Sequence, residues 1–155
     1  MIRFEDLNRY RLFLESVWVN HRKQWNPERT PKIVSTYMCR YSCIFLINIL
    51  KKEYELDCQI INGRPKFKYL EGTKFGKYGY KDVKGKWYDH SWITLNNKII
   101  DLTSDQFGGD KVVFTTINNC NYNPSPNQKA FEQDFTSLTP VVNKWIKYYE
   151  ASYVD

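Results

Sequence analysis

Apolar residues recur every three or four positions in three stretches of the chain: residues 4–22, 35–53 and 137–153. That spacing puts them on one face of a helix, so each stretch predicts an amphipathic α-helix. Elsewhere the pattern changes to the short apolar runs of extended chain, at residues 55–62, 90–95, 98–102 and 111–117. Because these strands are gathered after two helices, we expect an α+β fold. A central helix in the N-terminal half of the chain should pack on one face of an antiparallel sheet.

The hairpin predicted within residues 88–109 is the most informative part of the chain. In its first strand the residues at 90, 92 and 94 alternate with those at 91, 93 and 95, the pattern of a half-buried strand. The pair Asn96-Asn97 that follows tolerates the positive φ of a tight turn. A two-residue turn pairs Leu95 with Lys98 and fixes the register of every pair that follows.

That register places His90 and Asp101 on one face of the hairpin as diagonal neighbours. A carboxylate in this position can orient an imidazole and stabilise its protonated form. The hairpin therefore supplies two of the three members of a catalytic triad.

The nucleophile that would complete the triad is Cys39, in the first turn of the helix predicted at 35–53. Ser35 or Thr36 can cap this helix, and a helix N-terminus stabilises a thiolate. Cys43 is the competing nucleophile, but it lies one turn deeper and should be more desolvated. With Cys39 as the thiolate, His90 as the base and Asp101 as the residue that orients the base, the three roles follow one another along the chain.

Four further residues are candidates around the triad. Asp105 competes with Asp101 for the third position, although it lies past the expected end of the strand, where a turn or capping role is the alternative. Trp92 is expected to pack against the His–Asp pair and shield it from water. Thr103 and Gln106 are expected to hydrogen-bond around the pair.

The segments MCRYSCIFLINIL and HSWITLNNKIIDLT resemble the cysteine helix and the histidine–aspartate hairpin of the transglutaminase-like, papain-like cysteine superfamily. Cys39, the His-x-Trp of His90 and the Asp-x-Thr of Asp101 fall on the positions of that pattern. The tail SDQFGG is similar to that of small bacterial and phage-associated members. The resemblance covers residues 37–109.

The resemblance implies one papain-like or transglutaminase-like domain over residues 1–155. It also implies a thiol enzyme that cleaves or transfers an amide or acyl group of a protein or peptide substrate, as a protease, amidase, deamidase or transglutaminase. Gln24 is the candidate for the upstream glutamine of the oxyanion hole. The backbone N–H of Cys39 is the preferred oxyanion donor.

The composition bears on domain number, on metal sites and on the state of the cysteines. The 155 residues, 42% of them hydrophobic, are expected to fold as one globular domain. No CxxC pair occurs and the chain has two histidines, so neither a zinc site nor another cofactor is expected. Free thiols are the default for the four cysteines, which are Cys39, Cys43, Cys58 and Cys120.

No apolar run approaches the roughly 20 residues that span a bilayer, and the first residues lack the order of a signal peptide. We therefore expect a cytoplasmic protein with no membrane partner.

The net charge of +6 allows two interpretations. A Lys-rich stretch at 63–86 can recruit an acidic protein substrate, whereas scattered lysines more often form a solvated surface. Because no nucleic-acid motif accompanies the charge, nucleic acid is not the expected partner. The alternative to an enzyme is a non-catalytic binding or adaptor protein on the same fold, phage- or toxin-related, that uses its Tyr- and Lys-rich surface.

Overall fold

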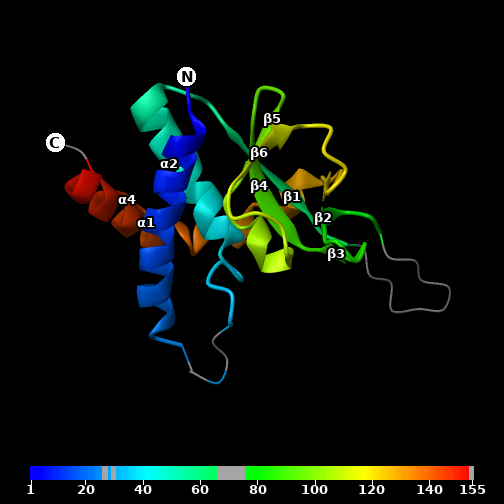
Figure 1. The fold of residues 1–155 in the computed structure, drawn as a ribbon, viewed down its shortest axis with the longest axis horizontal. Coiled ribbons are helices and arrows are strands. Elements are labelled where there is room, and N and C mark those ends of the chain that lie inside the picture. The colour runs from blue at the N-terminus through cyan, green and yellow to red at the C-terminus, as the bar shows by residue number, and fades with distance from the viewer. Residues whose placement is uncertain (26–27, 29–30, 66–75, 154–155) are drawn as a thin grey trace.

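The computed structural model describes residues 1–25, 28, 31–65 and 76–153. Its helices lie together on one side and its strands form two antiparallel sheets on the other (Figure 1). The helices are α1 (Phe4–Arg22), α2 (Cys39–Tyr54), α3 (Gln133–Thr136) and α4 (Thr139–Tyr153). The larger sheet has the order β1 (Gln59–Gly63), β4 (His90–Leu95), β5 (Lys98–Asp101) and β6 (Val113–Thr116). The smaller sheet has the order β3 (Trp87–Tyr88), β2 (Gly79–Lys81) and β7 (Tyr122–Asn123).

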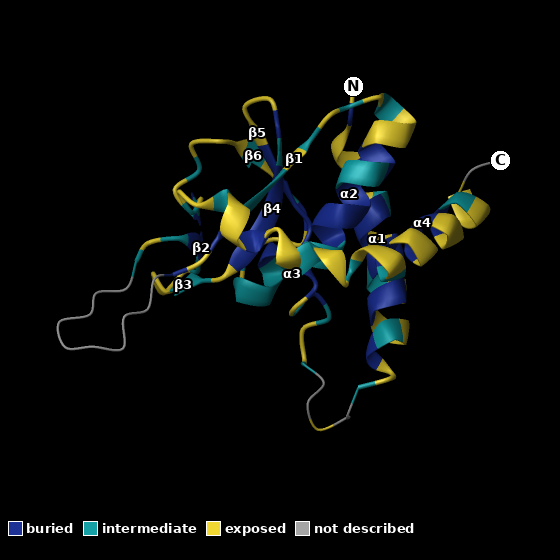
Figure 2. Cartoon of the chain, turned by 180° about the vertical axis from the view of Figure 1, so that it is seen from behind, coloured by how far each residue is buried: buried dark blue, intermediate teal, exposed yellow. Residues whose placement is uncertain are grey.

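The predicted α+β architecture is confirmed at this level, with α2 packed between the large sheet and α4. Buried residues concentrate along α2 and β4 (Figure 2). Aromatic rings of three helices pack together in this core. The ring centroid of Phe13 of α1 lies 5.6 Å from that of Phe45 of α2 and 5.2 Å from that of Tyr149 of α4. None of the helices in the described ranges is long and apolar enough to cross a membrane.

The start of the second helix differs from the prediction. α2 begins at Cys39, after Tyr37 takes a left-handed φ of 65° and Met38 becomes the N-cap residue. No side-chain hydrogen bond caps the helix, so the predicted capping by Ser35 or Thr36 is wrong. Apolar spacing continues through this turn, and spacing alone therefore could not locate it. Cys39 is consequently the first residue of the helix.

The register of the hairpin is confirmed: Leu95 pairs with Lys98, and Ile93 pairs with Ile100. The turn is closed with Asn96 at φ 54°.

The prediction of a half-buried strand is wrong, because β4 is buried on both faces. The helices cover Ile93 and Ile100, while Trp92 and Ile99 pack against the smaller sheet through Tyr122. Strands of two or three residues carry no readable alternation, and this is why the sequence did not predict the sheet that covers the second face. Residues 66–75, the middle of the predicted basic stretch, lie outside the described residues.

Candidate active site

The centre of the site is the pair of His90, the first residue of β4, and Asp101, the last residue of β5. His90 Nε2 donates a hydrogen bond to Asp101 Oδ2 at 2.7 Å. Both side chains are buried. The hairpin thus brings together the diagonal pair that the sequence predicted.

Asp101 is held by three further hydrogen bonds. The backbone N–H of Thr103 donates to Asp101 Oδ1 at 2.9 Å, and the Thr103 hydroxyl donates to the same oxygen at 3.2 Å. Tyr122 Oη donates to Oδ2 at 2.8 Å. Burial opposes the charge on the carboxylate, but His90 and these donors outweigh it and lower the pKa of Asp101. The expected hydrogen bonding by Thr103 is present. Tyr122 was not among the residues predicted from the sequence.

Cys39 stands at the N-terminal end of α2 with 6% of its surface exposed. Burial would raise the pKa of its thiol, yet the interaction with His90, the charge of Arg40 and the backbone N–H of Ser91 together lower it. Burial likewise opposes a charge on His90, but Asp101 and Cys39 raise the pKa of the imidazole to about 9. The two shifts favour a thiolate–imidazolium pair.

The nitrogen of His90 that serves the thiol follows from the first hydrogen bond. Nε2 is taken by Asp101. Nδ1 is buried and has no hydrogen-bond partner among the described residues. Because the ring interacts with the Cys39 thiol, we infer that Nδ1 is the nitrogen turned toward it.

Cys43, the competing nucleophile, lies in a different environment one turn further along α2. It is 2% exposed, and burial raises the pKa of its thiol well above 9.0, with the charges of Cys39 and Asp101 acting in the same direction. No imidazole stabilises its thiolate. Burial therefore favours the protonated thiol at Cys43.

Aromatic rings surround the imidazole. Phe107 meets His90 edge to face at 5.0 Å between ring centroids, and Tyr80 does so at 5.6 Å. Trp92 lies 5.9 Å from His90 and is buried, in keeping with its expected shielding role.

The tail SDQFGG now has a structural role. It forms the 3-10 turn η2 (Ser104–Phe107), which delivers Phe107 to the imidazole and ends at Gly108 with φ 89°. A Cβ on Gly109 would lie 2.4 Å from Tyr80 Oη, so the chain needs glycine where it passes this ring.

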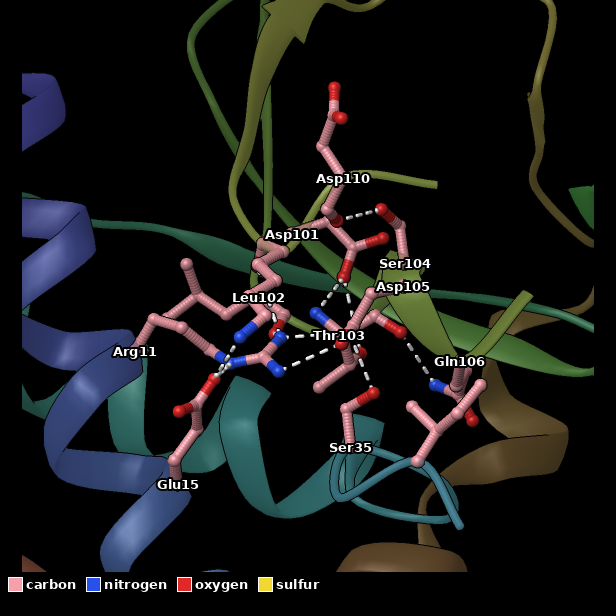
Figure 3. A network of polar contacts seen from close by, with 12 residues as sticks. Arg11, Glu15, Ser35, Asp101, Leu102, Thr103, Ser104, Asp105, Gln106 and Asp110 are labelled. Carbon is pink, nitrogen blue, oxygen red and sulfur yellow. Dashed lines mark hydrogen bonds and ion pairs between the residues drawn. The ribbon is translucent and has the colours of Figure 1, made fainter. Parts of the chain in front are cut away.

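Asp105, the competitor for the third triad position, takes no part in the histidine pair. Its carboxylate binds the guanidinium of Arg11 and the hydroxyl of Ser35 (Figure 3). Gln106 bonds to the neighbouring backbone: its Nε2 donates to the Thr103 carbonyl at 2.9 Å, and its Oε1 accepts from the Tyr37 N–H at 3.3 Å.

Gln24 is exposed beyond the end of α1, where it lines a cavity of about 370 Å³ together with Trp145 of α4. The residues that line this cavity include neither Cys39 nor His90.

No group of three or more His, Cys, Asp or Glu side chains in the described ranges could hold a metal ion. Comparison of the chain with protein-family models, curated proteins and solved structures finds no match.

Replacing Tyr122 with phenylalanine should lower the free energy of unfolding by about 1.5–3 kcal/mol, the usual contribution of a hydrogen bond to a charged group. Because Tyr122 lowers the pKa of Asp101, it adds stability above the carboxyl's ordinary pKa of 3.8 that is lost as the pH falls. Tyr122→Phe should therefore begin acid unfolding at a higher pH. Urea and acid titrations measure both effects. Tyr148→Phe, at an exposed position on α4, is the control. Identical losses in the two variants would contradict this role.

Proposed function

We propose that the chain is a thiol enzyme of papain-like or transglutaminase-like fold that cleaves or transfers an acyl group through Cys39, His90 and Asp101. One observation carries the proposal. His90 is held by Asp101 at 2.7 Å through Nε2 while its ring interacts with a cysteine at a helix N-terminus. Those are the three roles that a thiol nucleophile needs: the thiolate, the base and the group that orients the base.

The reaction starts from the ion pair. The Cys39 thiolate attacks the carbonyl carbon of the acyl donor, a C–S bond forms, and the carbonyl electron pair moves to oxygen. The backbone N–H of Cys39 is a suitable donor to this oxyanion, because the first N–H groups of a helix have no intrahelical acceptor. The intermediate collapses, and the leaving group takes the proton from His90 Nδ1 as it departs.

The acyl-enzyme is resolved by a second nucleophile. His90 removes a proton from water or from an amine, which attacks the thioester carbonyl and releases the Cys39 thiolate. Water gives a protease, amidase or deamidase, and an amine gives a transglutaminase. We propose a protein or peptide as the substrate, and the net charge of +6 supports an acidic one.

A second candidate function is favoured by the closure of the site. His90 is 0% exposed and Cys39 is 6% exposed, so the reacting atoms are covered in this conformation. A non-catalytic binding or adaptor protein could keep such a triad as a buried structural cluster. Chemical access to the thiol separates the two functions, because an enzyme must open this site to its substrate and a structural cluster need not.

Incubation with p-nitrophenyl acetate tests the proposed chemistry without knowledge of the substrate. The expected result is a burst of p-nitrophenol and a transient acetyl thioester on Cys39, located by mass spectrometry of the tryptic peptides. Cys39→Ala should abolish the burst with the fold intact, while Cys43→Ala should retain it, because the Cys43 thiol is held protonated. A burst that survives in Cys39→Ala would refute the assignment.

A further inference from the structure

A buried polar cluster joins three segments around the proposed triad: α1, the turn before α2, and η2 (Figure 3). Arg11 of α1 is 2% exposed, and its Nη1 and Nη2 each donate to the Asp105 carboxylate at 2.8 Å. Its Nε donates to Glu15 at 2.9 Å. The cluster therefore contains one buried guanidinium between two carboxylates.

One side of this cluster reaches the residues that lead into Cys39. Ser35 is fully buried, and its Oγ donates to Asp105 Oδ1 at 2.6 Å. The carbonyl of Ser35 accepts from the N–H of Met38, the N-cap residue of α2, at 3.0 Å. Gln106 adds a second link from η2 to this turn through the Tyr37 N–H at 3.3 Å.

The other side reaches the residues that follow Asp101. Arg11 Nη1 donates to the Leu102 carbonyl at 2.6 Å. Leu102 is the residue next to Asp101, whose carboxylate holds His90. Hydrogen bonds thus connect Asp105 through Ser35 to the turn before Cys39, and through Arg11 to the end of β5, which carries Asp101.

The hydroxyl of Ser35 is not needed to balance charge. Asp105 already accepts two hydrogen bonds from Arg11, and Glu15, the other carboxylate on this guanidinium, is also paired with Lys111 at 3.3 Å. What the Ser35 bond adds is a fixed position of the turn before α2 relative to η2. Loss of the Ser35 hydroxyl should therefore have a larger effect on the reactivity of the Cys39 thiol than on the free energy of unfolding.

We propose that Asp105 and Ser35 are positioning residues, which clamp the start of α2 against the hairpin and so set the separation between Cys39 Sγ and the imidazole of His90. This inference rests on the proposed function, because it concerns the same ion pair. The thiolate is stabilised by a nearby positive charge, and that attraction weakens as the separation grows. Loosening the clamp should therefore raise the pKa of the Cys39 thiol.

Ser35→Ala removes the link and leaves the Arg11–Asp105 ion pair in place. The pH profile of the rate of Cys39 alkylation by iodoacetamide should keep its shape, but its midpoint should move to higher pH by about one unit. That shift is a tenfold change in the thiolate–thiol equilibrium. Ser35→Thr keeps a hydroxyl and should move the profile back toward wild type. Ser42→Ala is the matched control, since Ser42 is also buried and lies closer to Cys39 in the chain. Among the described residues, no hydrogen bond joins it to η2.

A Ser35→Ala profile that coincides with wild type, or a Ser42→Ala profile that shifts equally, would overturn the clamp. Should Ser35→Ala fail to fold, Gln106→Ala removes the second link and must shift the profile in the same direction, or the clamp is refuted.

Hydrogen exchange of the Ser42 amide, which donates to the Met38 carbonyl, reports on the start of α2 independently of thiol chemistry. Faster exchange in Ser35→Ala supports the clamp, and unchanged exchange refutes it. Faster exchange together with an unreactive wild-type Cys39 would uphold the clamp and refute the proposed function.

Discussion

Replacing His90 with glutamine should slow alkylation of Cys39 by iodoacetamide at neutral pH about 100-fold or more, the lower range for loss of a general base. The reason lies in two thiols on one helix. Cys39 and Cys43 are both buried, yet the pKa of Cys39 is lowered and that of Cys43 is raised well above 9.0. The interaction with His90 is the main difference, and without it burial should dominate at Cys39.

The chain offers a matched control, because its only other histidine is His21, at the end of α1. His21→Gln should leave the alkylation rate unchanged. Trypsin cleaves after Arg40, so Cys39 and Cys43 are quantified in separate peptides. Equal rates in His90→Gln and wild type would show that the imidazole does not activate the thiol.

Asp105→Ala should lower the free energy of unfolding by about 3–5 kcal/mol, the cost of breaking a buried ion pair from one side. Arg11 would keep Glu15 and two backbone carbonyls as partners, which favours the lower end of that range. Urea unfolding followed by circular dichroism measures the change. The buried guanidinium, rather than the lost carboxylate, is the physical origin of this cost.

Two comparisons isolate that origin. The double variant Arg11→Met with Asp105→Leu should recover much of the loss, because it removes the buried guanidinium together with Asp105 and leaves Glu15 paired with Lys111. Asp57→Ala breaks a solvent-exposed pair with Lys51 and should change little. If Asp105→Ala costs no more than Asp57→Ala, the cluster does not stabilise the fold.

The features that the sequence predicted correctly depend on local periodicity. The helices at both ends of the chain and the register of the hairpin follow from spacing within about 20 residues. His90 and Asp101 meet because that register is fixed by a two-residue turn at Asn96.

What the sequence did not predict depends on contacts between distant segments. Tyr122 reaches Asp101 from a strand of two residues, which has no pattern of its own. Arg11 pairs with Asp105 over 94 positions, and a charged residue in an amphipathic helix normally indicates a solvent-facing position. Gln24 was selected by type and by order along the chain, and neither predicts its place in a cavity beside Trp145 of α4.

If Cys39 is a thiolate activated by His90, the pH profile of its alkylation in the wild-type protein should show it. Because the pKa of Cys39 is lowered from 9.0 and that of His90 is raised to about 9, the ion pair should persist below pH 9. We expect Cys39 to react at neutral pH faster than the exposed Cys120, with a rate that declines only toward more acid pH. A Cys39 rate that rises only at or above pH 9, and stays below that of Cys120 throughout, would contradict this expectation.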